Sequence, residues 1–199
     1  MPDATAATVV GNVNYVSGAV SIAHADGRKR LIGVGSVLEN GDTVQTAQDA
    51  EAVLIFTDSQ RIYLKPGSVF RIDDFSFVAD SPGANKSFIS LIKGGLRTIS
   101  GLIGKHGNEA DYQLKTKTAT IGIRGTEYSV VDCAGGNCGG LPDGIHVSVY
   151  DGLVLVSNEA GGAEIGTGAG AIVFTVTAPV TQLPAREVQP VVAPPEACL

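Results

Sequence analysis

The fold is decided by the stretch Leu114-Lys-Thr-Lys-Thr-Ala-Thr-Ile-Gly-Ile-Arg-Gly-Thr-Glu-Tyr-Ser-Val-Val131, in which strand-type alternation persists but changes face twice. In a β-strand successive side chains point to opposite faces, so the apolar residues of one strand should share one parity. The apolar positions move from even to odd and back to even: Tyr112 and Leu114, then Ile121 and Ile123, then Tyr128 and Val130. Each change requires a bulge or a bend, for which Gly122 and Gly125 offer backbone freedom. The stretch therefore predicts two or three short strands that pass through the middle of an all-β domain.

A second change of parity lies near the N-terminus. Val13 and Tyr15 occupy odd positions, whereas Val20 and Ile22 occupy even ones. Gly18 lies between the two pairs, so we expect the chain to turn a corner there.

Three dipeptides predict hairpin turns, namely Asp26-Gly27, Asp58-Ser59 and Asp151-Gly152. Asp-Gly favours a two-residue turn because both central residues of a type I′ turn have positive φ. The expected facing pairs are Ile22 with Leu31, Val53 with Leu64, Leu54 with Tyr63, Ile55 with Ile62, Val147 with Val156, and Val149 with Val154. The middle hairpin carries apolar residues on both faces, so both faces should be covered.

The chain as a whole reads as an all-β fold, built from short twisted strands in a β-sandwich or a β-helix-like stack. No helical periodicity of useful length is present, and turn signals recur about every 8 to 12 residues. We expect a disordered N-terminus over residues 1–8, an all-β domain over residues 9–176, and a disordered Pro-rich tail or linker over residues 177–199.

Charge argues against a nucleic-acid partner, and hydropathy argues against a membrane-spanning segment. The formal net charge is −6 with a pI near 5.0, and no basic run is present, so a nucleic-acid partner is not expected. No window holds the ~18 consecutive apolar residues that a membrane span requires. The first residues, Met1-Pro-Asp-Ala-Thr-Ala-Ala, do not resemble a signal peptide, so either the protein is cytosolic or a leader has been removed.

Two of the three cysteines, Cys133 and Cys138, are separated by the four residues Ala-Gly-Gly-Asn. A loop of this length and composition can bring two thiols to disulfide distance, and we favour a small disulfide. Free thiols remain an alternative. A zinc site would need two more ligands, and only His146 lies near in the sequence.

No catalytic, cofactor or metal site is expected. The three histidines lie in separate segments without a carboxylate at metal spacing, and Cys138 competes for the sulfur of any nucleophile formed by Cys133 with His146. The enzymatic alternative is a hydrolase assembled from distant carboxylates such as Asp42, Asp58 or Asp73. A deep pocket lined by two carboxylates of raised pKa would favour it.

Arg124 is the strongest candidate for a charged group held inside the fold, because Ile123 and Gly125 flank it. A guanidinium among aliphatic residues must find a carboxylate or several carbonyl groups. We expect an internal ion pair with Asp42, Asp58, Asp73 or Glu127, and recognition of an anionic ligand is the alternative.

Several motifs together resemble the FecR domain family. They are Gly11-Asn-Val-Asn-Tyr-Val-Ser-Gly-Ala-Val20, Asn40-Gly-Asp-Thr-Val44, Phe56-Thr-Asp58, Arg61-Ile-Tyr-Leu64, Gly95-Leu-Arg-Thr-Ile-Ser-Gly-Leu-Ile-Gly-Lys105, Thr118-Ala-Thr-Ile-Gly-Ile-Arg-Gly-Thr126, Val149-Tyr-Asp-Gly152 and Gly166-Thr-Gly168. The resemblance spans residues 8–176, and the order of so many motifs makes it specific.

The resemblance implies a non-enzymatic, extracytoplasmic β domain of the bacterial envelope, periplasmic, secreted or displayed on the surface. In signalling members the domain passes a signal from an outer-membrane transporter to a regulator of a sigma factor. This chain shows no membrane span or cytoplasmic helical segment, so we expect a module that binds an envelope protein, or alternatively a glycan. An adhesive surface module and a fragment of a transmembrane-signalling regulator are further alternatives. Structural or binding roles are expected for Gly122, Arg124, Gly125, Thr126, Asp42 and Asp58.

Overall fold

The computed structural model describes residues 8–106, 109–136, 138–184 and 191–193 of the chain. Within them, sixteen strands form one continuous sheet. The strands are β1 Val9–Ser17, β2 Val20–Ala23, β3 Lys29–Leu31, β4 Val37–Glu39, β5 Thr43–Thr46, β6 Glu51–Phe56, β7 Arg61–Leu64, β8 Val69–Ser76, β9 Lys86–Lys93, β10 Gly95–Ile99, β11 Tyr112–Lys115, β12 Thr120–Cys133, β13 Gly144–Asn158, β14 Gly161–Gly166, β15 Gly170–Val173 and β16 Thr181–Leu183. The helical elements are α1 Leu102–His106, η1 Pro82–Ala84 and η2 Glu109–Asp111. The all-β class expected from the sequence is confirmed.

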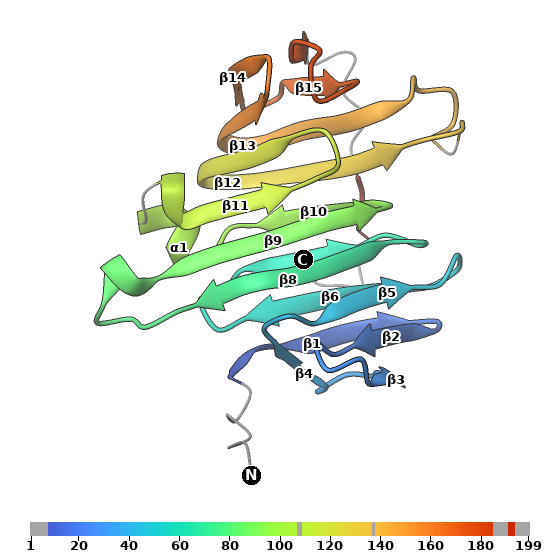
Figure 1. Ribbon diagram of the computed structural model, residues 1–199, viewed down its shortest axis with the longest axis vertical. Coiled ribbons are helices and arrows are strands. Elements are labelled where there is room, and N and C mark those ends of the chain that lie inside the picture. The colour runs from blue at the N-terminus through green and yellow to red at the C-terminus, as the bar shows by residue number, and fades with distance from the viewer. Residues whose placement is uncertain (1–7, 107–108, 137, 185–190, 194–199) are drawn as a thin grey trace.

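The sheet folds over on itself at β12 and β13, so that it forms two layers around a common core. Strands pair in the order β3-β2-β5-β8-β9-β11-β12-β10-β7-β6-β1-β4. Layer A comprises β3, β2, β5, β8, β9, β11, the first half of β12, the second half of β13, and β14. Layer B comprises β4, β1, β6, β7, β10, the second half of β12, the first half of β13, β15 and β16. Figure 1 shows the strands of each layer stacked along the long axis, with the two layers one behind the other and the chain climbing from β1 to β15.

Strand β12 carries the second parity change within one bent strand. Ile121 pairs with Leu114 of β11 in layer A, and Val130 pairs with Leu96 of β10 in layer B. The register shifts between Arg124 and Glu127, and Gly125 has a positive φ of 55° at the bend. Apolar side chains on both sides of the bend are buried, as the alternation predicted: Ile121, Ile123, Tyr128 and Val130. Gly122 does not serve the bend, because it lies in the regular part of the strand opposite Leu155.

The expected hairpin at Asp151-Gly152 is wrong. Residues 144–158 form the single strand β13, which runs antiparallel to β12 over its whole length. The chain bends at Gly152 without reversing, because β13 must cross from layer B to layer A beside the bend of β12. The buried apolar side chains accordingly change parity across it, from Val147 and Val149 to Val154 and Val156.

The two other predicted hairpins exist, but each register is shifted by one residue. Ile22 faces Arg30 instead of Leu31, and Leu54 faces Ile62 instead of Tyr63. In both hairpins the amide of the last residue before the turn donates a hydrogen bond to the carbonyl of the residue four positions later. These bonds are His24 N to Arg28 O and Phe56 N to Gln60 O. The loops therefore have three residues, a common hairpin type with one left-handed residue, here Gly27 and Ser59. One consequence is that Leu31 is 75% exposed, not buried.

The chain changes layer at corners that include the predicted one. Strand β1 ends in layer B at Ser17, Gly18 has a φ of 74°, and β2 begins in layer A at Val20. A Cβ at Gly18 would lie 2.8 Å from the Cβ of Ala50, so close packing at the corner also requires glycine there.

The sheet continues past residue 176, the expected end of the domain. Strand β16 pairs with β15, and Val191 is only 5% exposed. The expected disorder of residues 1–7, 185–190 and 194–199 concerns positions outside the described residues. Within the described part of the chain, no helix has the length and apolar character needed to cross a membrane.

Candidate interaction surfaces

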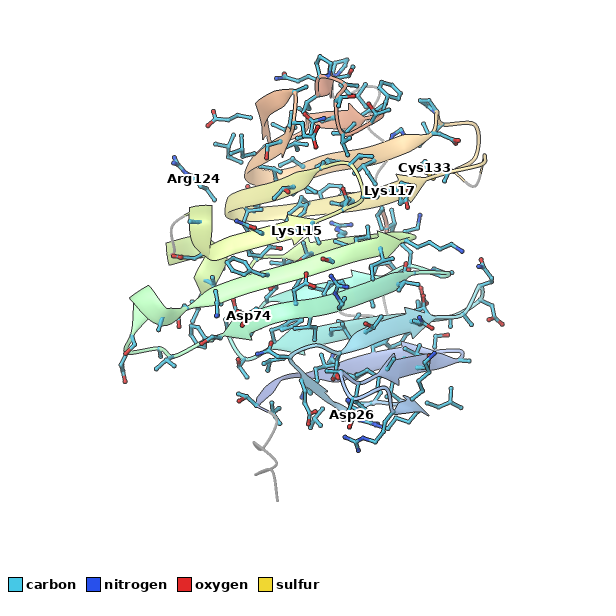
Figure 2. All side chains as sticks on the ribbon, in the orientation of Figure 1. Asp26, Asp74, Lys115, Lys117, Arg124 and Cys133 are labelled. Atoms are coloured by element: carbon cyan, nitrogen blue, oxygen red, sulfur yellow. A yellow bond between two sulfur atoms is a disulfide. The ribbon has the colours of Figure 1, made fainter. Side chains whose placement is uncertain are left out.

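Arg124 lies on the surface, so the expected internal ion pair rests on a wrong premise. Because Ile121 and Ile123 point inward, the even position 124 points outward, and Figure 2 shows the Arg124 side chain directed away from the sheet. The carboxylate of Glu127, one of its expected partners, accepts hydrogen bonds from Arg97 at 2.9 Å and 2.5 Å. Recognition of an anion by Arg124 stays a prediction.

Thr126 is a structural residue beside the bend of β12. Its side chain is buried, its hydroxyl donates to the carbonyl of Leu153 at 3.2 Å, and its amide donates to Ser100 Oγ at 2.9 Å. These contacts tie β12 to β13 and to the end of β10. Gly125 and Thr126 therefore act together in shaping the bend.

Asp42 joins a cluster that the sequence did not predict. His24 Nδ1 lies 2.7 Å from Asp42 Oδ1 and 3.9 Å from Glu39 Oε2, because β2 and β5 pair Ala23 with Thr43. Asp42 Oδ2 also accepts the Glu39 amide at 2.8 Å, and Arg30 Nε lies 3.3 Å from His24 Nε2. Only the strand pairing could have revealed this proximity.

These three side chains have the donor types of a metal site, but their contacts favour a structural role. Both oxygens of the Asp42 carboxylate already accept hydrogen bonds, and a guanidinium beside the imidazole would repel a cation. We assign the cluster to holding the turn between β4 and β5 against β2.

Asp58 fastens the β6–β7 turn to α1. One carboxylate oxygen accepts the Gln60 amide at 2.9 Å, the other accepts the Ile103 amide at 3.3 Å, and the Asp58 carbonyl accepts the Leu102 amide at 2.9 Å. Burial raises the pKa of this carboxyl group, and the hydrogen bonds from the amides oppose that rise. The backbone at Gly101 lies so close to the Asp58 carboxylate that a Cβ at Gly101 would be 2.3 Å from Asp58 Oδ2.

Among the described residues, the hollow beside Asp58 does not hold the carboxylate pair that a hydrolase would need. A hollow of about 220 Å³ borders Asp58, and Asp58 is the only carboxylate among the described residues that line it. Asp73 is engaged elsewhere, with Arg71 Nε at 2.5 Å and with Ser90 Oγ at 2.5 Å.

The disulfide between Cys133 and Cys138 is present, with the two Cα atoms 5.5 Å apart. It closes the loop that follows β12, at the edge of the molecule where Figure 2 labels Cys133. The alternatives of free thiols and of a zinc site are therefore not adopted by this structure.

A chain of buried polar groups crosses the core and was not foreseen. Tyr112 of layer A and Tyr128 of layer B share a hydrogen bond of 2.7 Å, and Gln60 Nε2 donates to the Tyr112 hydroxyl at 3.0 Å. Ser87 of layer A donates to Gln60 Oε1 at 3.1 Å. Burial raises the pKa of both tyrosines, so their hydroxyl groups stay protonated and link the two layers.

The outer face of layer B carries a transverse row of side chains, here called the tyrosine row. Its members face one another directly across β1, β6, β7, β10 and β12: Tyr15, Val53, Tyr63, Arg97 and Ser129. The apolar outer face of the β6–β7 hairpin is covered as predicted, by residues 191–193. The Val191 side chain packs against Val53 and Tyr63.

Comparisons with known proteins identify related sequences and folds. The sequence model of a protein family described as "FecR protein" matches residues 42–155, more than half of the chain. Two crystal structures of a candidate anti-sigma factor from Parabacteroides distasonis match with a TM-score of 0.56 and 15% identity, over 73% of this chain and 61% of that chain. At that identity the likeness shows a shared fold, and the chain spans about three fifths of the length of that protein.

A further solved structure, described as a cell surface anchoring domain, matches with a TM-score of 0.30 and 21% identity over 31% of this chain and 82% of that chain. This score is too low to carry an argument. No curated protein matches the sequence.

Proposed function

The chain belongs to the FecR protein family, and on that premise we propose that it is a non-enzymatic, extracytoplasmic β domain that binds a protein partner in the bacterial cell envelope. The disulfide between Cys133 and Cys138 supports this location, because such bonds persist in oxidising compartments. The fold shared with a candidate anti-sigma factor favours a role in signalling for this domain and its partner over a purely adhesive role.

The observation that carries the proposal is the open edge at β14. Four strands of the described sheet have a partner on one side only, and three of them are three residues long: β3, β4 and β16. Short length and basic residues, such as Lys29 and Arg30 in β3, are the usual protection of a sheet edge against pairing. Strand β14 has six residues, contains neither lysine nor proline, and carries one charge, Glu164. This edge is therefore suited to receive an added strand from a partner.

Proline substitutions at two adjacent positions of β14 test the proposal. Along an edge strand the backbone amides point alternately toward the neighbouring strand and toward the open side. One of the two substitutions, Ala163→Pro or Glu164→Pro, therefore removes a backbone hydrogen bond to β13, and the other removes only an amide that points to the open side. The variant that keeps the melting temperature of the wild type identifies the open donor. We expect this variant to lose capture of the envelope partner in a pull-down from envelope extract.

A proline in another edge strand of the sheet serves as a matched control. Gln182→Pro changes the short strand β16 and should leave capture intact. Equal capture by all three variants would contradict recognition through β14. Capture of a polysaccharide in place of a protein would instead favour the glycan alternative.

A further inference from the structure

Residues 191–193 lie on the tyrosine row as a bound peptide would. The Val191 amide donates to the Tyr150 hydroxyl at 2.7 Å, and its carbonyl accepts from Arg97 Nη1 at 2.9 Å. Its side chain is 5% exposed and packs on Val53 and Tyr63, whereas the side chain of Val192 is 72% exposed. One residue is thus held through its amide, its carbonyl and its side chain, while the next one points into solvent.

The groups that hold Val191 are positioned by other side chains of the sheet. Arg97 donates through Nε to Glu127 at 2.9 Å, and its guanidinium lies 4.2 Å above the centre of the Tyr150 ring. The Tyr150 hydroxyl lies 2.9 Å from Ser129 Oγ. Tyr150 can therefore donate a hydrogen bond to Ser129 Oγ while its own oxygen accepts the hydrogen bond from the Val191 amide. These contacts leave Arg97 Nη1 and the Tyr150 oxygen directed at a main chain above the sheet.

The two tyrosine side chains on the apolar side of the site are also held in place by hydrogen bonds. The Tyr63 hydroxyl donates to Glu51 at 2.6 Å, and the Tyr15 hydroxyl donates to the same carboxylate at 3.4 Å. Tyrosine rings fixed in this way offer a large contact area at low entropic cost. A preorganised site loses little freedom on binding, which favours recognition of a short extended segment.

We propose that the tyrosine row, together with Tyr150, is a recognition site for an extended polypeptide segment of a partner protein, centred on a branched aliphatic residue. Residues 191–193 occupy this site in cis and are displaced by the partner. The site lies on the outer face of layer B, whereas β14 belongs to layer A, so the site can be tested whether or not the β14 edge binds a partner.

The test uses the 199-residue chain with Val191→Asp, which places a carboxylate where the valine is buried and so vacates the site. The probe is a fluorescent peptide with the sequence of residues 187–196, Glu-Val-Gln-Pro-Val-Val-Ala-Pro-Pro-Glu, and binding is measured by fluorescence anisotropy. We expect the variant chain to bind this peptide and to bind a Val191→Asp version of the peptide at least about tenfold more weakly, because the charge would enter an apolar site.

The wild-type chain should bind the same peptide more weakly than the variant chain, because its own segment competes. A short linker gives an effective concentration of about 1 mM, so a peptide with a dissociation constant of about 0.1 mM would lose about tenfold in apparent affinity. No difference between the two chains would show that residues 191–193 do not compete for the site, and would overturn their role as its cis occupant.

Two conservative changes in the Val191→Asp chain separate recognition from general packing. Tyr150→Phe removes the oxygen that receives the peptide amide and should weaken binding by about tenfold. Tyr15→Phe removes a hydroxyl of the same row that does not contact Val191, and it should change the affinity less than about twofold. Equal effects of the two changes would contradict the assigned contacts.

Failure to bind the peptide by a Val191→Asp chain that keeps its melting temperature would overturn the proposal. Val191→Gly, which keeps the main-chain groups, is the milder variant for the same measurement. A chain that unfolds with either substitution would also overturn it, because residues 191–193 would then be an integral part of the fold.

Discussion

Gly152→Ala is expected to be among the most damaging single-methyl additions in this protein. Gly152 has a φ of 82°, and a Cβ there would lie 2.3 Å from the Gly125 carbonyl oxygen and 3.1 Å from that of Arg124. The left-handed backbone costs about 1–2 kcal/mol for a residue with a Cβ. The overlap is with main-chain atoms at the bend of β12, and forced overpacking of this kind costs about 1–3 kcal/mol. We therefore expect a loss of roughly 2–5 kcal/mol in the free energy of unfolding.

Two other glycines of the same region provide the controls. Gly125 has a φ of 55°, and no atom lies within 4 Å of the position that a Cβ would take, so Gly125→Ala should cost only the backbone contribution of about 1–2 kcal/mol. Gly122 has no positive φ, and its nearest neighbour would be Leu155 Cβ at 4.0 Å. Gly122→Ala should leave stability unchanged or raise it by about 0.5–1 kcal/mol, because glycine weakens a strand.

The measurement is urea unfolding followed by far-UV circular dichroism, with the disulfide intact in all variants. The expected order of stability is Gly122→Ala, then Gly125→Ala, then Gly152→Ala as the least stable. A Gly152→Ala chain as stable as Gly125→Ala would refute the close crossing of β12 and β13. Residues 151–152 would then behave as an ordinary exposed turn.

Two further predictions concern a covalent bond and a titrating group. Replacing Cys133 and Cys138 with serine should cost about 2 kcal/mol in the chain-entropy model, because the closed loop is short; a loss above about 4 kcal/mol in urea unfolding would show that the loop does more than close locally. Burial raises the folded-state pKa of Asp58 above its unfolded value, so its contribution to stability is fully present below the unfolded pKa and is lost as the pH rises through the folded pKa. The unfolding free energy of the wild type relative to Asp58→Asn should therefore fall as the pH rises from about 4 to about 7, and a rise over that range would contradict the assigned burial.

Local pattern was sufficient for the class of the fold and for the places where the chain changes layer. The parity of apolar residues predicted the bend of β12 between Ile123 and Tyr128 and the corner at Gly18, because a strand that changes face must bend wherever one face is buried. The same alternation indicated that the β6–β7 hairpin needed cover on its outer face. The family was also recognisable, since the order of many short motifs is preserved in the sequence itself.

Local pattern was insufficient wherever one short sequence is compatible with two backbone conformations. Asp151-Gly152 supports either a reversing turn or a bend, since a left-handed glycine serves both. The turns after His24 and Phe56 contain three residues where two were expected, which moved every facing pair by one. Arg124 was placed inside the fold because its neighbours are aliphatic, although the parity of Ile121 and Ile123 already placed it outside.

The amino-acid pattern was enough to identify an all-β protein of the FecR family whose strands turn at glycines, because alternation and turn chemistry act over a few residues. Which residues meet was visible only in the folded chain: His24 with Asp42, Tyr112 with Tyr128, and Val191 with Arg97 and Tyr150. These contacts join segments far apart in the chain, and their partners depend on strand order and register, which local side-chain preferences do not specify.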